Sequence, residues 1–340
     1  MNPKALAPVA LFVYNRADNT RATLRALMAN TLASQTDLYV FSDGGRDKAS
    51  WAAVREVRAL LREVEDEVAR TRALNSITIV ERPENYYLER NIIEGIGHVF
   101  LQHDTIIVLE DDIVTAPHFL EFMNDALGLY RDDQRVMHVS GFTRLQANDE
   151  LRGLRSTVGR SSFYFSPFMA GWGWGTWRDR WNGRFLHFST REEALEGLSP
   201  DLLSAMEYGG VFPCLKDLNR SPIPWDICWG IAIRKAEGLC LYPSQTLVRN
   251  IGLSGGTHYG LSGINFSFFT FHFSFNISRL LWRYDYDRPP FEGRIELTRQ
   301  EPAANPEVEA AMREALTDWG IRYTRLGRIV RRIYHLVKGL

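Results

Sequence analysis

Three consecutive carboxylates, Glu110, Asp111 and Asp112, follow a short apolar stretch at residues 105–109. Such a stretch predicts a buried parallel strand, and open α/β sheets bind ligands at the carboxyl ends of their strands. Packed like charges repel each other, so this cluster is tolerated mainly when it is solvated or when a cation such as Mg²⁺ or Mn²⁺ neutralises it. An acidic cap on a helix expected to start at Pro117 is the alternative, and the triplet alone does not decide between them.

Polar residues also end the first two expected strands. Asn15 and Arg16 follow residues 9–14, and Asp43 with two glycines follows residues 38–42. A nucleotide needs such an edge, because a carboxylate accepts hydrogen bonds from base or ribose while amide and guanidinium groups donate to carbonyl and phosphate oxygens. Taken singly, a turn and a solvated loop explain these groups more simply. Together they predict one crevice that binds a nucleotide.

The segment at residues 171–175 reads Gly-Trp-Gly-Trp-Gly. The sequence has no P-loop motif and no dinucleotide-binding glycine motif after the first strand, so phosphates must be held in another way. We expect Trp172 and Trp174 to act as aromatic platforms for sugar rings. A tightly packed aromatic core is an equally good interpretation.

The elements that would position these groups alternate along the first 140 residues. Short apolar runs alternate with segments of helical periodicity, which predicts a mostly parallel sheet. The expected strands are residues 9–14, 38–42, 77–80, 105–109 and 136–140, and the expected helices are residues 20–32, 50–70, 88–101 and one beginning at Pro117. The alternation is lost after residue 140, where phenylalanines at residues 266–275 predict one further strand with an aromatic face.

Composition and charge exclude several classes of protein. The 340 residues are 45% hydrophobic, which excludes a disordered chain, and a net charge of -1 gives no overall field to recruit nucleic acid. The three cysteines, Cys214, Cys228 and Cys240, form no metal or redox motif and suit a reducing compartment. We find no signal peptide and no apolar stretch of about 18 residues, so we expect a cytoplasmic protein.

The order of these motifs resembles that of the GT-A glycosyltransferases and is most similar to the N-acetylglucosaminyltransferase I type. The series runs through residues 9–16, 42–44, 82–90, 109–112 and 171–174 to Trp225 and Asp226, and covers roughly residues 8–262. The resemblance implies an α/β fold of the GT-A, Rossmann-like kind, with a mostly parallel sheet flanked by helices and a C-terminal helical appendage.

The resemblance also implies roles for individual residues. Asp112 would bind a divalent metal, Mn²⁺ or Mg²⁺, that bridges the donor diphosphate, with His258 as a second candidate ligand, and Asp226 would be the catalytic base. The implied donor-binding residues are Asn15, Arg16, Asp43, Arg90, Glu110, Asp111 and Ser254, and the implied sugar platforms are Trp172, Trp174 and Trp225. Relatives have W-D-D-W where residues 225–229 read Trp-Asp-Ile-Cys-Trp, so the register of the base stays open.

The resemblance therefore predicts a metal-dependent, inverting glycosyltransferase that uses a nucleotide-sugar, expected to be a UDP-sugar, and a carbohydrate or lipid-linked acceptor. It would be a hexosyl- or N-acetylhexosaminyltransferase of glycan or polysaccharide biosynthesis. A nucleotidyltransferase is one alternative, although it would be expected to keep a glycine-rich phosphate loop after the first strand. A non-catalytic carbohydrate-binding protein is the other, and it would leave the carboxylates unexplained.

We expect one catalytic domain over residues 1–290, with a nucleotide-sugar half to about residue 140 and an acceptor half over residues 141–290. Residues 291–340 would form a linker and a C-terminal amphipathic helix. Apolar residues between Leu326 and Val337 recur at helical spacing among basic residues. This pattern predicts a helix that rests either on an anionic membrane surface or on the protein itself.

Overall fold

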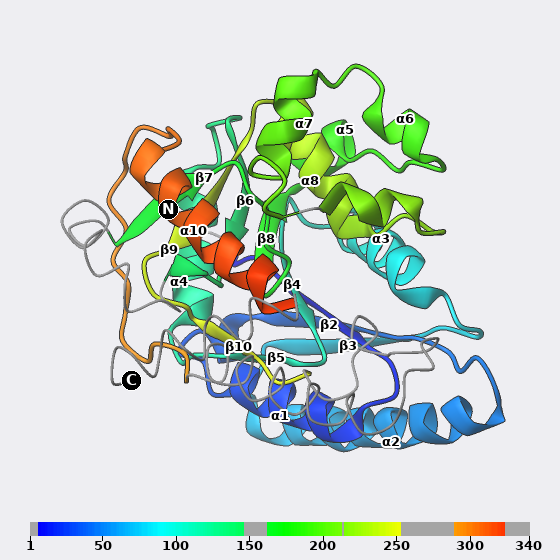
Figure 1. Cartoon of the computed structure of the whole chain (residues 1–340). Coiled ribbons are helices and arrows are strands. Elements are labelled where there is room, and N and C mark those ends of the chain that lie inside the picture. The colour runs from blue at the N-terminus through cyan, green and yellow to red at the C-terminus, as the bar shows by residue number, and fades with distance from the viewer. Residues whose placement is uncertain (1–5, 146–161, 213, 253–288, 324–340) are drawn as a thin grey trace, which may run out of the picture.

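The computed structural model describes residues 6–145, 162–212, 214–252 and 289–323 (Figure 1). These residues form a sheet of eight strands in the order β3-β2-β1-β4-β8-β6-β9-β7 and a separate antiparallel pair, β5 and β10. The strands are β1 (Val9–Val13), β2 (Asp37–Ser42), β3 (Ser76–Glu81), β4 (Thr105–Glu110), β5 (Ile113–Thr115), β6 (Val136–Ser140), β7 (Phe163–Ser166), β8 (Trp174–Trp177), β9 (Leu239–Pro243) and β10 (Val248–Asn250).

The large sheet is mostly parallel. Strands β1 to β4 run parallel to one another, β8 is antiparallel to both β4 and β6, β9 is parallel to β6, and β7 is antiparallel to β9. All five residues of β1 are buried, as expected for a central strand covered on both faces. Strands β2 and β3 lie on one side of β1 and β4 on the other, so the strand order reverses between β1 and β4. A ligand crevice is expected where the order reverses.

Helices cover both faces of the sheet. They are α1 (Ala17–Met28), α2 (Lys48–Thr71), α3 (Tyr87–Val99), α4 (Phe119–Leu129), α5 (Arg178–Arg184), α6 (Arg191–Leu195), α7 (Pro200–Met206), α8 (Trp225–Lys235) and α10 (Pro306–Tyr323). Figure 1 shows α1 and α2 together on one face of the N-terminal half, while α3 lies on the opposite face beside α8. Helix α2 forms here because its apolar residues recur every three or four positions and Asp47 caps its first turn with Ser50 in a capping box.

The strands and helices predicted for the first 140 residues are confirmed to within a few residues, and the helix expected from Pro117 begins at Phe119. The short strand β5 was not predicted. The expected mostly parallel α/β sheet is also confirmed. Beyond residue 140 the sequence did not predict β7, β8, α8 or β9. The strand predicted at residues 266–275 lies outside the described residues.

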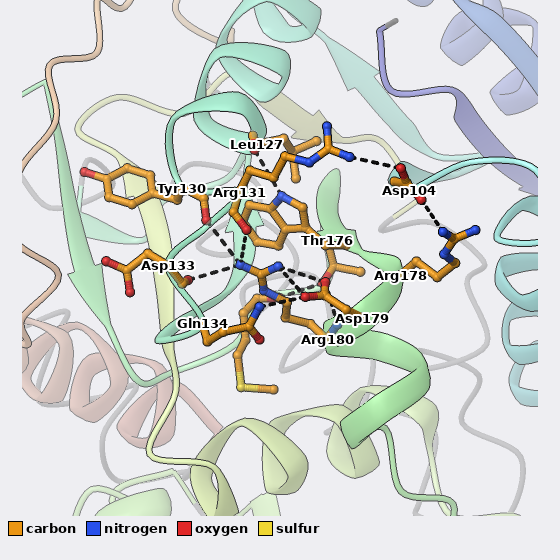
Figure 2. Close-up of polar contacts among 12 residues, drawn as sticks. Asp104, Leu127, Tyr130, Arg131, Asp133, Gln134, Thr176, Arg178, Asp179 and Arg180 are labelled. Atoms are coloured by element: carbon orange, nitrogen blue, oxygen red, sulfur yellow. Dashed lines mark hydrogen bonds and ion pairs between the residues drawn. The ribbon is translucent and has the colours of Figure 1, made fainter. Parts of the chain in front are cut away.

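A buried arginine joins the end of α4 to the start of α5 (Figure 2). The Nη2 atom of Arg180 donates to the backbone carbonyls of Tyr130, Arg131 and Asp133, at 3.2, 2.6 and 3.2 Å, and Nη1 binds the carboxylate of Asp179 at 2.8 Å. Carbonyls that follow a helix carry partial negative charge, so they and the carboxylate together compensate the buried cation. This contact fixes β8, which immediately precedes α5, against α4.

The described part of the C-terminal segment is helix α10. Val308, Ala311, Met312 and Leu316 of this helix are buried in the main hydrophobic core. The apolar stripe that begins at Leu326 lies outside the described residues, so its contact with a membrane or with the protein stays a prediction. Among the helices that the structure describes, none has the length and apolar character needed to cross a bilayer.

Candidate active site

A cavity of 710 Å³ lies where the order of the strands reverses. Arg16 comes from the segment after β1, and Glu110 and Asp112 from the end of β4. Asp226, in the first turn of α8, lines the same cavity, and Trp172 contributes an aromatic wall. The structure thus brings three of the strand-end groups expected from the sequence together with the residue expected to be the catalytic base.

Arg16 forms ion pairs with both aspartates that follow β4. Its Nη2 atom lies 2.9 Å from Oδ2 of Asp112, and it also donates to Oδ1 of Asp111. The two aspartates are buried, and burial raises the pKa of Asp111 to about 6 although the charge of Arg16 acts in the opposite direction. The pKa of Arg16 is raised overall, because the two carboxylates outweigh the lowering effect of burial. Thr23 of α1 fixes the turn by donating to the backbone carbonyl of Asp111 at 2.9 Å.

Negative charge accumulates around Glu110. Burial raises its pKa well above the ordinary value, and the nearby carboxylates of Asp112, Asp111 and Asp226 raise it further. Four acidic side chains are therefore close enough to influence one another, and the charge of Arg16 acts in the opposite direction on the pKa of Glu110. Such a site has a strong local attraction for a cation even though the chain as a whole is almost neutral.

The donor set fits a cation held together with phosphate. Among the described residues, no three His, Cys, Asp or Glu side chains form a complete metal-binding group. Mg²⁺ is commonly bound through one or two carboxylates plus substrate phosphates, and Asp112 can supply such a carboxylate. Nη1 of Arg16 is buried without a hydrogen-bond partner in the part of the chain described, and an anionic oxygen would satisfy it. A divalent cation bound to a diphosphate would fit both groups, because the cation would bind Asp112 and a phosphate oxygen would accept a hydrogen bond from Nη1 of Arg16.

Gly252 leaves space for this arrangement. A Cβ atom added at Gly252 would lie 1.9 Å from Oδ2 of Asp112 and 2.8 Å from Nη1 of Arg16. Any side chain at this position would therefore displace the carboxylate. The backbone can approach Asp112 this closely only because glycine has no side chain. The sequence alone gave no sign of this contact between Gly252 and Asp112.

Asp43 is buried and organises the neighbouring strand end without lining the cavity. Its Oδ1 atom accepts hydrogen bonds from the backbone N–H groups of Gly44 and Tyr86, at 2.9 and 2.7 Å. Its Oδ2 atom accepts one from the side chain of Asn85 at 2.9 Å. Burial raises the pKa of Asp43 overall, although the hydrogen bonds from the N–H groups of Tyr86 and Gly44 act in the opposite direction. Asp43 thereby holds the loop after β3 against the end of β2, and its contact with a nucleotide stays a prediction.

Two other expected donor-binding residues also lie outside the cavity lining. Arg90 is half exposed, pairs with Glu94 at 2.7 Å and Glu84 at 3.5 Å, and lies over the ring of Tyr86. Asn15 is partly buried between β1 and α1. Ser254 and His258 lie outside the described residues.

The three tryptophans expected to form sugar platforms differ in position. Trp174 is completely buried in β8 and stacks between His138 and Trp225, with ring centroids 5.1 and 5.3 Å away. Its ring therefore packs in the core behind the cavity, which is the alternative interpretation of this segment. Trp172 and Trp225 line the cavity, and the ring of Trp172 packs against Phe142 with a centroid distance of 4.6 Å.

Sequence reasoning missed several residues that line the cavity. They include Arg234 on α8, and Phe168, Met206, Phe212 and Lys216 from other segments. Arg234 could have been found only if helix α8 had been predicted. Within that helix, Asp226 and Arg234 are eight positions apart and lie on one face.

The model of the GNT-I family matches residues 1–184, which is more than half of the chain. Solved structures that are similar include a mannosyltransferase from Pyrobaculum calidifontis in complex with GDP-Man and Mn²⁺, with 13% identity, coverage of 99% of this chain and 79% of that chain, and a TM-score of 0.42. TarS of S. aureus also matches, with 13% identity, coverage of 39% and 21%, and a TM-score of 0.28. No curated protein matches the chain. The family match confirms the resemblance drawn from the motifs, and the chain is a glycosyltransferase that belongs to the GNT-I family.

Proposed function

We propose that this protein transfers a sugar from a nucleotide-sugar donor to an acceptor hydroxyl, with a divalent cation and with inversion at the anomeric carbon. The observation that carries this proposal is the position of Asp112 and Asp226 in the lining of one cavity. Asp112 follows β4 at the expected ligand edge of the sheet, and Asp226 lies in the first turn of α8. Asp112 can therefore bind the metal on the diphosphate while Asp226 contacts the acceptor hydroxyl.

Asp112 would hold the cation, Mn²⁺ or Mg²⁺, on the donor diphosphate. The cation, when bound, neutralises charge on the departing nucleoside diphosphate. Arg16 would donate to a phosphate oxygen through Nη1, the buried atom that has no partner among the described residues. Both interactions strengthen as the bond to the leaving group breaks, so they lower the barrier more than they increase ground-state binding.

Asp226 would accept the proton of the attacking hydroxyl. Its Oδ1 atom accepts a hydrogen bond from the N–H of Ile227 at 2.9 Å, which orients the carboxylate in the first turn of α8. The acceptor oxygen would form the new bond to the anomeric carbon as the diphosphate departs. A base that acts on the acceptor is the arrangement that inversion requires, because the hydroxyl attacks from the side opposite the leaving group.

We further propose a UDP-sugar as donor and a hexosyl or N-acetylhexosaminyl group as the sugar transferred. Asn15, Asp43, Arg90, Glu110 and Asp111 would contribute to the donor side, directly or through the loops that they fix. Trp172 and Trp225 line the cavity; Trp172 is the more exposed of the two and can offer apolar surface to a sugar ring, while Trp225 is buried against Trp174 and would contribute its edge. Roles for Ser254 as a donor contact and His258 as a metal ligand remain part of the proposal.

The acceptor would be a carbohydrate or lipid-linked saccharide in glycan or polysaccharide synthesis. A cytoplasmic location would place the enzyme where nucleotide-sugars are available. Residues 324–340 would bring it to the inner face of the membrane if their basic, amphipathic pattern binds anionic lipid. Nucleic acid is not an expected partner, because the net charge is only -1.

A thermal-shift screen of nucleotide-sugars with Mn²⁺ and with EDTA tests the proposed function. A ligand at 100 times its dissociation constant stabilises the folded state by about 2.7 kcal/mol, which gives a measurable shift. We expect at least one nucleotide-sugar to stabilise the protein only when Mn²⁺ is present. Stabilisation by free saccharide without nucleotide or metal would favour a carbohydrate-binding protein, and stabilisation by nucleoside triphosphates alone would favour a nucleotidyltransferase. Product from the accepted donor must show an inverted anomeric configuration.

A further inference from the structure

The cavity has two regions of opposite charge. The edge of the sheet contributes acidic groups, with Glu110 and Asp112 in the lining. The wall formed by α8 and by residues 214–219, which pack against it, contributes Lys216 and Arg234 together with the acidic Asp217, and Arg144 and Arg220 also line the cavity. We call Lys216 and Arg234 the basic pair. A cavity that served only a neutral sugar would not require cations away from the proposed diphosphate site.

Helix α8 spans the distance between the proposed base and Arg234 of the basic pair. Asp226, Gly230 and Arg234 are spaced four residues apart and all line the cavity. Eight residues of α-helix correspond to about 12 Å. A Cβ atom added at Gly230 would have no atom within 4 Å, so the helix face between the two charged residues is open. An extended ligand can therefore lie along α8 with one end at Asp226 and the other at Arg234.

Arg234 is available for such a ligand. It is partly buried and lines the cavity, and its guanidinium makes no hydrogen bond or ion pair with another described residue. Glu309 and Arg234 both lie near Tyr208 and act in opposite directions on its pKa. The carboxylate of Glu309 accepts a hydrogen bond from the hydroxyl of Tyr208 at 3.0 Å. A partly desolvated guanidinium without a carboxylate partner favours an anionic ligand, with which it can form two parallel hydrogen bonds.

Part of the cavity lining is apolar. Phe168, Met206 and Phe212 contribute to it, and the rings of Phe168 and Phe212 pack edge to face with centroids 5.6 Å apart, while the guanidinium of Arg144 lies over the ring of Phe168. Aromatic faces suit the apolar face of a sugar ring, so this part of the cavity fits a saccharide better than an inorganic ion.

We propose that the acceptor is an anionic saccharide whose phosphate or carboxylate group is bound by Arg234 and Lys216, about 12 Å from the hydroxyl that Asp226 activates. This inference rests on the proposed function and adds the class of acceptor. A distance of two helical turns exceeds one pyranose ring, so the proposal requires an acceptor of at least two sugar units. The anionic group takes no part in the transfer and positions the reacting hydroxyl.

A panel of matched acceptors tests this proposal. Each disaccharide is offered as the neutral methyl glycoside, as the 1-phosphate and as the terminal uronic acid, with the accepted donor and Mn²⁺. We expect kcat/KM for an anionic member to exceed that of its neutral counterpart at least about tenfold, because hydrogen bonds between charged groups belong to the strong class. Comparison of the 1-phosphate with the uronic acid identifies which anion the site prefers.

Substitutions on α8 connect this preference to Arg234. Arg234→Gln should remove the preference mainly by raising KM for the anionic acceptor, Arg234→Lys should retain part of it, and donor hydrolysis without acceptor should not change. Lys235→Gln is the matched control, because Lys235 is exposed and donates to the carbonyl of Glu196 at 2.8 Å outside the cavity. It should leave the preference intact.

Equal use of neutral and anionic members, an unchanged preference in Arg234→Gln, or donor hydrolysis without transfer to any anionic member would overturn the proposal. Absence of both metal-dependent donor binding and donor hydrolysis in the unsubstituted protein would instead contradict the proposed function. The two failures are therefore distinguishable.

Discussion

Arg16 donates a hydrogen bond to Asp112 across the boundary between β1 and β4, with 2.9 Å between Nη2 and Oδ2. The same guanidinium pairs with Asp111, and both carboxylates are buried. The arginine thus compensates the negative charge that a bound cation would also compensate. Arg16 and the proposed cation would both bind the carboxylate of Asp112. A substitution at Arg16 should therefore change how the protein responds to metal.

Arg16→Gln should destabilise the protein and increase its response to metal. Removing one partner of a buried pair costs about 3 kcal/mol, because the remaining charge is left without compensation. Mn²⁺ should restore part of that loss, so the increase in Tm on adding Mn²⁺ should be larger in the variant than in the unsubstituted protein. Arg21→Gln is the control, since Arg21 pairs with Glu63 at 3.7 Å between largely exposed side chains. Identical responses to Mn²⁺ in all three proteins would show that Arg16 and the cation do not share a site.

Gly252→Ala should impair metal-dependent donor binding while leaving most of the fold intact. The added methyl group would meet the carboxylate of Asp112 at 1.9 Å, so Asp112 must move. We expect at least about a tenfold loss of UDP affinity in Mn²⁺, equivalent to about 1.4 kcal/mol. Gly97→Ala is the matched control, because its Cβ would meet no atom within 4 Å and alanine favours the helix. Titration calorimetry of both variants measures the difference, and unchanged affinity in Gly252→Ala would place the cation elsewhere.

Asp226→Asn should leave donor affinity nearly unchanged and reduce turnover by at least about a hundredfold, because general bases contribute factors of that order. Pre-steady-state and steady-state rates, together with UDP binding, separate the two effects. An equal loss of donor affinity and turnover would make Asp226 a binding or folding residue. Retained anomeric configuration in the product would likewise exclude it as the base in an inverting reaction.

His138 should make the protein less stable as the pH falls. It is completely buried, its Nε2–H donates to the carbonyl of Ala170 at 3.1 Å, and burial lowers its pKa to about 3. An unfolded chain takes up this proton near pH 6.5, so between about pH 6 and 4 unfolding is favoured by up to about 1.4 kcal/mol for each pH unit. His138→Gln should lack this contribution, and its free energy of unfolding in urea should vary less steeply over that range.

The control for this comparison is His187→Gln, which removes an exposed histidine. Only the slope against pH is compared, because substitution of a buried ring also changes stability at every pH. Parallel slopes for the unsubstituted protein and His138→Gln would mean that His138 titrates alike in the folded and unfolded chains.

The first half of the fold could be predicted because its signals are local. Strands such as β1 are continuous apolar runs, and α2 has an apolar stripe and a capped first turn. The carboxyl ends of parallel strands share an edge, so the proximity of Arg16 and Asp112 followed from their positions after β1 and β4. Their ion pair could not be predicted in this way. The position of a residue at the end of a strand indicates which residues lie nearby, but it does not indicate which side chains bind each other.

The second half depended on contacts between distant parts of the chain. Trp174 could serve a cavity or a core equally well by sequence, and its burial is decided by β4 and β6 on either side of β8. Helix α8 has apolar residues around much of its circumference, which obscures the periodicity that marks a surface helix. Without that helix, Arg234 could not be related to Asp226.

Titration calorimetry of UDP, with Mn²⁺ and with EDTA, tests the central claim most directly. The proteins are the unsubstituted chain, Asp112→Asn and the control Asp66→Asn, which changes an exposed aspartate on α2. We expect the unsubstituted chain and Asp66→Asn to bind UDP only with Mn²⁺, and Asp112→Asn to lose at least about tenfold in affinity with an unchanged circular dichroism spectrum, because the amide keeps the shape and removes the charge. Binding of UDP by Asp112→Asn with the affinity and metal dependence of the unsubstituted chain would contradict the account.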